Sequence, residues 1–179
     1  AEDNTTELTY SIFCTAAESG ERIGTVHISV EATTVGSGIL LSQDVDIYEG
    51  ETAAETVVRM LQNNGYSVDY TGNYETGFYL ARISSESNFV TGNIPEDLRT
   101  KLEEHGFEIY DFTPNSLGDY DFTKGSGWMY QVNGVYPNYG LSDYCFQNGD
   151  TLRLRFTLAY GADIGQDMTG GSDNWGYEW

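Results

Sequence analysis

Apolar and polar residues alternate through much of the chain, a pattern typical of β-strands that bury one face. The clearest example lies late in the chain, where apolar residues at every second position separate Thr151, Arg153, Arg155 and Thr157. The same alternation predicts further strands over residues 8–14, 26–30, 45–47, 66–70, 78–83 and 128–132. Residues 107–112 are a further candidate strand, with a less regular pattern.

Two segments carry the signals of helices instead. Thr52 and Glu55 fit a capping box, in which a hydroxyl and a carboxylate bind the free backbone amides of the first turn. An apolar stripe with helical spacing follows, and Gly65 is the expected end of this helix. A second helix is expected from Pro95 to about His105, because proline suits the first turn of a helix.

The order of these elements predicts an α+β fold. Two strands, one principal helix and then more strands are expected to form a mixed sheet with the helix packed across it, in the manner of β-grasp proteins. The second helix and several β-hairpins would be insertions. Asn133 and Gly134 predict a two-residue hairpin turn, and Asn148, Gly149 and Asp150 predict another turn.

Charge and composition narrow the range of partners. Asp and Glu outnumber Lys and Arg 28 to 8, giving a formal net charge of -20. Such a chain repels nucleic acids and anionic membranes, and no apolar run reaches the roughly 20 residues of a membrane-spanning helix. An acidic chain rich in tyrosine and glycine and poor in lysine is common among secreted and surface proteins. We therefore expect an extracellular or cell-surface location.

Two cysteines, Cys14 and Cys145, are candidates for a disulfide. The chain has no CxxC motif or Cys/His cluster, so a zinc site is not expected. In an oxidising compartment the two residues would pair, and closing so long a loop stabilises the fold by roughly 5 kcal/mol in the chain-entropy model. The alternative is two buried free thiols.

Catalytic residues are not apparent in the sequence. His27 and His105 are the only histidines; the first falls on the polar face of a strand and the second at a helix end, where a positive imidazole suits the helix dipole. Neither belongs to a Ser/His/Asp or Cys/His motif. No spacing singles out a pair of carboxylates of the kind that glycosidases use. We therefore predict a non-enzymatic protein.

Some charged residues are candidates for binding ions. Calcium prefers hard oxygen ligands, and three pairs of acidic residues on or near loops supply them: Asp44 and Asp46, Asp119 and Asp121, and Asp163 and Asp167. The alternative is a solvated acidic surface. Arg153 and Arg155 share one strand face, where they would pair with carboxylates or, alternatively, bind an anionic ligand group.

The aromatic stretch over residues 125–144 is the main candidate for a binding site. Tyrosine combines an apolar ring with a polar tip, which suits stacking on a corrin, a sugar or a peptide. The candidate ligand-binding residues are Trp128, Tyr136, Asn138, Tyr139, Asp143 and Tyr144. Trp128 alternates onto the face that would be core, and the loop tyrosines could instead pack among themselves. A second aromatic group, Trp175, Tyr177 and Trp179, would either fold back or occupy another surface.

These residues also carry a family resemblance. Residues 125–134 read GSGWMYQVNG, residues 137–144 read PNYGLSDY, and Asn148-Gly149-Asp150 precede the last strand. In this order they resemble the transcobalamin-like C-terminal domain family, whose bacterial members are mostly domains of unknown function. The resemblance covers residues 24–165. It leaves residues 1–23 as an extension with one strand, and residues 166–179 as an acidic aromatic tail.

The resemblance implies a β-grasp-like fold and a binding role. In animal cobalamin carriers this domain closes over vitamin B12 that is held against a larger helical domain. The 179 residues contain no counterpart of that helical domain, so cobalamin binding does not follow directly. We expect a secreted or cell-surface module that binds a corrinoid or another small ligand through the tyrosine-rich loops. The alternative is an adhesion or spacer module that binds a surface protein or glycan.

Overall fold

The structure is a computed structural model, and it describes residues 20–166. Four strands of this part form a mixed sheet in the order β2-β1-β7-β6. Its strands are β1 (Arg22–Ala32), β2 (Gly38–Tyr48), β6 (Gly127–Val132) and β7 (Thr151–Thr157). The first and last strands, β1 and β7, run parallel, whereas β1 with β2 and β6 with β7 are antiparallel.

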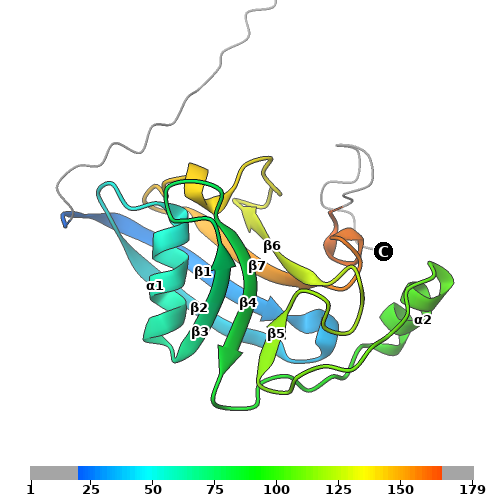
Figure 1. Cartoon of the computed structure of the whole chain (residues 1–179). Coiled ribbons are helices and arrows are strands. Elements are labelled where there is room, and N and C mark those ends of the chain that lie inside the picture. The colour runs from blue at the N-terminus through cyan, green and yellow to red at the C-terminus, as the bar shows by residue number, and fades with distance from the viewer. Residues whose placement is uncertain (1–19, 167–179) are drawn as a thin grey trace, which may run out of the picture.

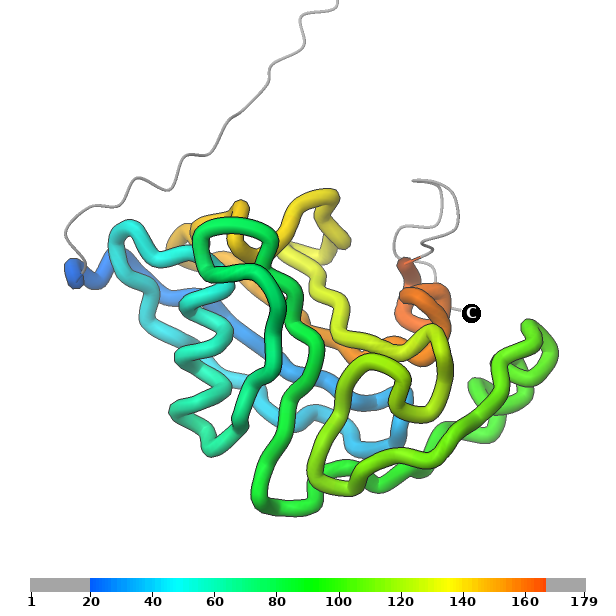
Figure 2. The backbone as a smooth tube through the Cα atoms, viewed as in Figure 1, coloured from blue at the N-terminus to red at the C-terminus, as the bar shows by residue number. Residues whose placement is uncertain are grey.

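A second layer covers one face of this sheet (Figures 1 and 2). It consists of helix α1 (Ala53–Asn63) and an antiparallel sheet of β3 (Tyr66–Thr71), β4 (Tyr79–Ser85) and β5 (Ser116–Gly118). The hydrophobic core lies between the layers, where the inward side chains of β1 and β7 meet those of α1, β4 and β5.

A long connection between β4 and β5 carries the second helix, α2 (Glu96–Glu104), to the side of the molecule away from α1 (Figure 2). Thr91 ties this connection to the short 3-10 helix η1 (Thr33–Val35), because its Oγ1 donates to the Val35 carbonyl at 3.0 Å. Leu102 is the fully buried residue of α2. In the part of the chain that is described, no helix is long and apolar enough to cross a membrane.

Several local predictions are confirmed. Each strand predicted between residues 26 and 132, apart from residues 107–112, overlaps a strand of the structure, and the run at 151–157 is the strand β7. The capping box of α1 is present: Thr52 Oγ1 accepts from the Glu55 amide at 3.3 Å, and the Glu55 carboxylate accepts from the Thr52 amide at 2.8 Å. At the other end Gly65 takes a left-handed φ of 82°.

One prediction about the region before β6 is wrong. Residues 107–112 form no strand; the Tyr110 amide donates to the Phe122 carbonyl at 2.6 Å, and Phe112 stacks on Phe122. The strand of this region, β5, lies instead at residues 116–118. The phenylalanine side chains of residues 107–112 pack against the core, and the strand that pairs with β4 is the short run 116–118.

The α+β class is confirmed, with helices and two sheets in the described residues. The predicted strand at residues 8–14 and residues 167–179 of the aromatic tail lie outside those residues.

Candidate functional site

The tyrosine-rich loop begins at the end of β6 and runs to the start of β7. Asn133 and Gly134 both have positive φ, as a two-residue hairpin turn requires, and Val132 and Val135 exchange backbone hydrogen bonds across them. The predicted turn is therefore present. It does not join two long strands, because β6 pairs along its length with β7.

Two contacts hold the middle of the loop against the second layer. Ala53, the first residue of α1, donates its amide to the Tyr144 carbonyl at 2.7 Å. Phe78, just before β4, donates its amide to Ser142 Oγ at 3.2 Å. Ser142 belongs to the short 3-10 helix η2 (Leu141–Asp143). The loop therefore rests on the start of α1 and the connection between β3 and β4, as Figure 2 shows.

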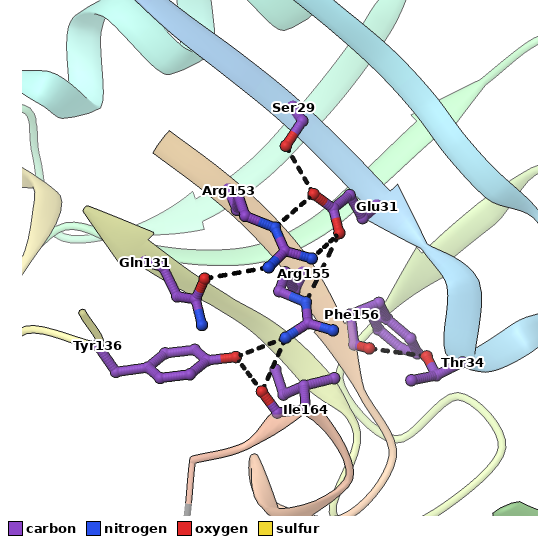
Figure 3. Close-up of polar contacts among 9 residues, drawn as sticks. All are labelled: Ser29, Glu31, Thr34, Gln131, Tyr136, Arg153, Arg155, Phe156 and Ile164. Carbon is purple, nitrogen blue, oxygen red and sulfur yellow. Dashed lines mark hydrogen bonds and ion pairs between the residues drawn. The ribbon is translucent and has the colours of Figure 1, made fainter. Parts of the chain in front are cut away.

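Trp128 and Tyr136, two of the candidate ligand-binding residues, have buried side chains. Trp128 Nε1 donates to the Leu117 carbonyl at 2.9 Å and joins the two sheets. The Tyr136 hydroxyl donates to the Ile164 carbonyl and accepts from Arg155 Nη1 at 3.2 Å (Figure 3). Both side chains hold the fold together, so a ligand can reach neither ring unless neighbouring segments move.

Tyr139 and Tyr144 form the accessible part of the loop. Their rings stack with centroids 5.4 Å apart and an interplanar angle of 17°. Tyr139 is 41% exposed, whereas Tyr144 is half-buried and packs edge-on against Phe146. The Tyr144 hydroxyl donates to Asp150 Oδ2 at 2.7 Å. Burial and this carboxylate raise the pKa of Tyr144, so the phenol stays protonated as a donor.

The same loop also carries polar residues near the stacked pair in sequence. Asn138 and Asp143 are exposed, and Asp143 Oδ2 accepts from the Gly140 amide at 3.2 Å. The Tyr130 hydroxyl donates to the Tyr139 carbonyl. The structure thus brings the rings of Tyr139 and Tyr144 together, and it leaves Asn138 and Asp143 exposed on the same loop.

A neighbouring aromatic cluster was not predicted as a site. Tyr70, Tyr74 and Phe78 lie around the connection between β3 and β4, with ring centroids 5.0 to 6.1 Å apart. Phe78 contacts the tyrosine loop through Ser142. In the sequence, Tyr70 and Phe78 served only as members of two alternating patterns that predict strands. Tyr70 lies at the end of one predicted strand and Phe78 at the start of the next, and this was the signal that the two rings would lie close together.

The outer face of the four-stranded sheet carries a charged cluster, drawn in Figure 3. Glu31 on β1 accepts from Arg153 Nε at 2.8 Å and from Arg153 Nη2 at 2.7 Å. Ser29 donates to the same carboxylate at 2.7 Å, and Arg155 Nε lies 3.6 Å from it. The predicted pairing of Arg153 and Arg155 with carboxylates is therefore confirmed. Parallel pairing of β1 with β7 brings these residues together across 122 positions of sequence.

The same face holds a hydrogen-bonded chain that the sequence did not reveal. Asp44 Oδ1 lies 2.7 Å from His27 Nδ1, and Ser42 Oγ lies 3.1 Å from His27 Nε2. The order of groups is that of a Ser/His/Asp triad. However, the side chains of His27 and Asp44 are 48% and 74% exposed, whereas such catalysis depends on oxyanion donors in a site that excludes water. Sequence alone could not reveal these hydrogen bonds, because they depend on the register in which β1 pairs with β2.

The candidate calcium ligands have other partners. Asp46 pairs with Arg22, and Asp121 pairs with Arg82, each at 2.6 Å; Asp119 accepts from the Tyr79 hydroxyl at 2.9 Å. Within residues 20–166 no group of three His, Cys, Asp or Glu side chains could hold a metal ion. Asp167 lies outside the described residues, as does Cys14, so the pairing of Cys14 with Cys145 stays a prediction.

Comparison with known proteins assigns part of the chain to a family model. Residues 107–157 match the model of a family described as a domain of unknown function, DUF4430. The matched segment includes β5, β6 and the tyrosine-rich loop and ends with β7. No curated protein matches the chain.

Proposed function

We propose that this chain is a non-enzymatic binding module of the transcobalamin-like type that acts outside the cell or at the cell surface. Its ligand would stack on the exposed ring of Tyr139. The observation that carries the proposal is the stacked pair of Tyr139 and Tyr144, held on a loop that hydrogen bonds tie to two other segments.

Physical arguments favour this surface as a binding site. An exposed tyrosine ring offers an apolar face for stacking at a low entropic cost, because its side chain has only two rotatable angles. Tyr144 supports the ring from behind, and Asp150 fixes Tyr144 in turn. Asn138 and Asp143 add exposed polar groups at the edge. Such a site suits a flat, partly apolar ligand with polar groups around its rim, as in a corrinoid.

The family assignment is supported from two directions. The matched segment 107–157 contains the motif GSGWMYQVNG, on which the resemblance to transcobalamin-like domains rests. The first and last strands lie parallel at the centre of a mixed sheet, and a single capped helix packs against it after a hairpin. This arrangement favours the β-grasp-like fold that the resemblance implies.

Titration with dicyanocobinamide and cyanocobalamin, followed through the corrin absorbance, tests the proposal. The wild-type protein should give a saturable change. Tyr139→Ala should weaken binding about tenfold, equal to about 1.4 kcal/mol, because the stacking contact is lost. The matched control is Tyr110→Ala, which removes a tyrosine of similar exposure, 43%, outside the loop. No spectral change at near-millimolar corrinoid, or equal weakening in both variants, would reject this assignment.

A surface adhesion module is the second candidate. It is favoured by several exposed tyrosines outside the loop, including Tyr70, Tyr79 and Tyr120, since tyrosine is enriched at protein and glycan contacts. A glycan and surface-protein array distinguishes the two functions. Selective capture of one glycan or protein that survives Tyr139→Ala, with no response to corrinoids, would favour adhesion.

A further inference from the structure

Two exposed tyrosines lie at one end of the three-stranded sheet, apart from the tyrosine-rich loop. Tyr79 begins β4 and is 46% exposed, and Tyr120 follows β5 and is 74% exposed. The antiparallel pairing of β4 with β5 brings these two ends together. The Tyr79 hydroxyl donates to Asp119 Oδ1 at 2.9 Å. Burial, this hydrogen bond and the nearby charges of Asp119 and Tyr120 raise the pKa of Tyr79 to about 12, so the two phenols are neighbours.

The backbone at Tyr120 is strained. Its φ is 66°, in the left-handed region that a bulky side chain rarely occupies. Phe122 has a similar φ of 69°, but its ring is buried and stacks on Phe112, so packing offsets the strain there. Tyr120 has no comparable gain, because most of its side chain faces solvent. Glycine would take this conformation without strain, and strained residues of this kind cluster at sites of function.

Hydrogen bonds on both sides of Tyr120 fix the loop that presents it. The Asp121 carboxylate accepts from Arg82 Nη1 at 2.6 Å and from the Gly118 amide at 2.8 Å. Arg82 Nη2 donates to the Asp119 carbonyl at 3.1 Å, and the Asp121 amide donates to the Gly118 carbonyl at 3.2 Å. The Tyr120 backbone is therefore ordered before any ligand arrives, which lowers the entropic cost of binding.

The surroundings of the two rings indicate the chemistry of the ligand. Asp119 and Arg82 lie beside them, whereas the exposed large aliphatic side chains of the described residues belong to β1, β2 and the turn after β6: Ile23, Ile39 and Val135. The contacts that dominate protein interfaces lie in fully desolvated patches, which this polar face does not offer. A carboxylate accepts more than one hydrogen bond, so Asp119 can receive hydroxyl donors besides Tyr79. The net charge of -20 repels anionic ligands.

We propose that Tyr79 and Tyr120 form the binding site of a neutral glycan. A sugar ring would stack its apolar face on Tyr120, and its hydroxyls would donate to Asp119. The proposal rests on the adhesion role, the second candidate function, and gives that role a ligand class and a position. The site shares no residue with the corrinoid site of the tyrosine-rich loop.

Titration of the amide NMR spectrum with neutral sugars tests the site; the probes are maltotriose, cellotriose, chitotriose and lactose. At least one should shift the amides of residues 79 and 118–121 in a saturable way, and the acidic trigalacturonate should bind at least about tenfold more weakly than that sugar. Tyr120→Gly should weaken binding at least about tenfold without lowering the urea midpoint, since glycine relieves the strain. The matched control is Tyr160→Gly, which changes another left-handed tyrosine (φ 53°, 45% exposed) in the turn after β7. It should alter the dissociation constant less than about twofold.

The proposal is overturned by no saturable shift with any of the neutral sugars, or by equal binding of trigalacturonate. These two results concern the wild-type protein alone, so they do not depend on the folding of a variant. Equal weakening by the two glycine substitutions would also overturn it, as would a lower urea midpoint in Tyr120→Gly, which would assign the ring to the fold.

Controls separate this site from the other proposals. Tyr139→Ala should bind the sugar like the wild type, so failure at this face and failure at the tyrosine-rich loop are distinguishable. Capture of a glycan on an array that survives Tyr120→Gly would support the adhesion role and reject this site.

Discussion

Replacing Glu31 by glutamine should destabilise the protein by about 2–3 kcal/mol at neutral pH. The Glu31 carboxylate is 8% exposed and accepts three hydrogen bonds of 2.7 to 2.8 Å from Arg153 and Ser29. Removing one member of a buried pair costs about 3–5 kcal/mol. Water can solvate part of Arg153, whose side chain is 44% exposed, so a cost at or just below the lower end of that range is expected. Glutamine would also turn an amide toward the arginine donors.

The pH dependence has a definite sign. Burial raises the pKa of Glu31, but the hydrogen bonds from Arg153 and Ser29 and the charge of Arg155 outweigh it, and the net pKa is lowered. A lowered pKa favours the carboxylate in the folded state, so the stabilisation is present above the unfolded pKa of about 4.3 and lost as pH falls through the folded pKa. The difference between the wild type and Glu31→Gln should therefore shrink at low pH.

Urea unfolding followed by tryptophan fluorescence, at about pH 7 and about pH 3, measures both effects. The matched control is Asp46→Asn, which breaks the 2.6 Å pair with Arg22 on the same sheet, where both partners are exposed; it should cost less than about 1 kcal/mol. A Glu31→Gln protein as stable as the wild type at neutral pH, or one with the same deficit at both pH values, would refute the reasoning.

Three further predictions concern single side chains. Trp128→Phe should lower the free energy of unfolding by about 2 kcal/mol, measured in urea, because the buried Leu117 carbonyl loses its donor; an unchanged midpoint would contradict this. Tyr79→Phe should remove a phenol that ionises near pH 12, measured by ultraviolet difference spectra; burial and then Asp119 raise its pKa. Because the folded state retains that proton, the wild type should lose stability above about pH 10, and the variant should lose less. His27→Gln should hydrolyse p-nitrophenyl acetate at the same rate as the wild type, which should not exceed the rate in buffer; a slower rate in the variant would argue for an enzyme.

Local signals in the sequence were enough to predict the elements whose stability is local. The helix after Thr52 was predictable because its cap, its apolar stripe and its terminal Gly65 lie within a few turns of each other. The strand over residues 151–157 was predictable because alternation persists through its whole length. Neither signal depends on a distant residue.

Features that depend on distant partners were not predictable in the same way. Tyr136 and Tyr139 lie three residues apart in one loop, yet the first is buried and the second exposed. The difference depends on distant partners, because the Tyr136 hydroxyl donates to the Ile164 carbonyl and accepts from Arg155. The arginines of β7 were expected to pair with carboxylates, but only the parallel register identifies Glu31 as the partner.

The central claim is that Tyr139 and Tyr144 contact the ligand while Tyr136 serves the fold. Ring-selective NMR of protein labelled with 13C-tyrosine, assigned through Tyr→Phe variants and titrated with dicyanocobinamide, tests it most directly. The account predicts ring shifts for Tyr139 and Tyr144 that saturate together, with the Tyr136 signal unchanged. Saturable binding that shifts other tyrosines and leaves the Tyr139 ring unchanged would contradict it.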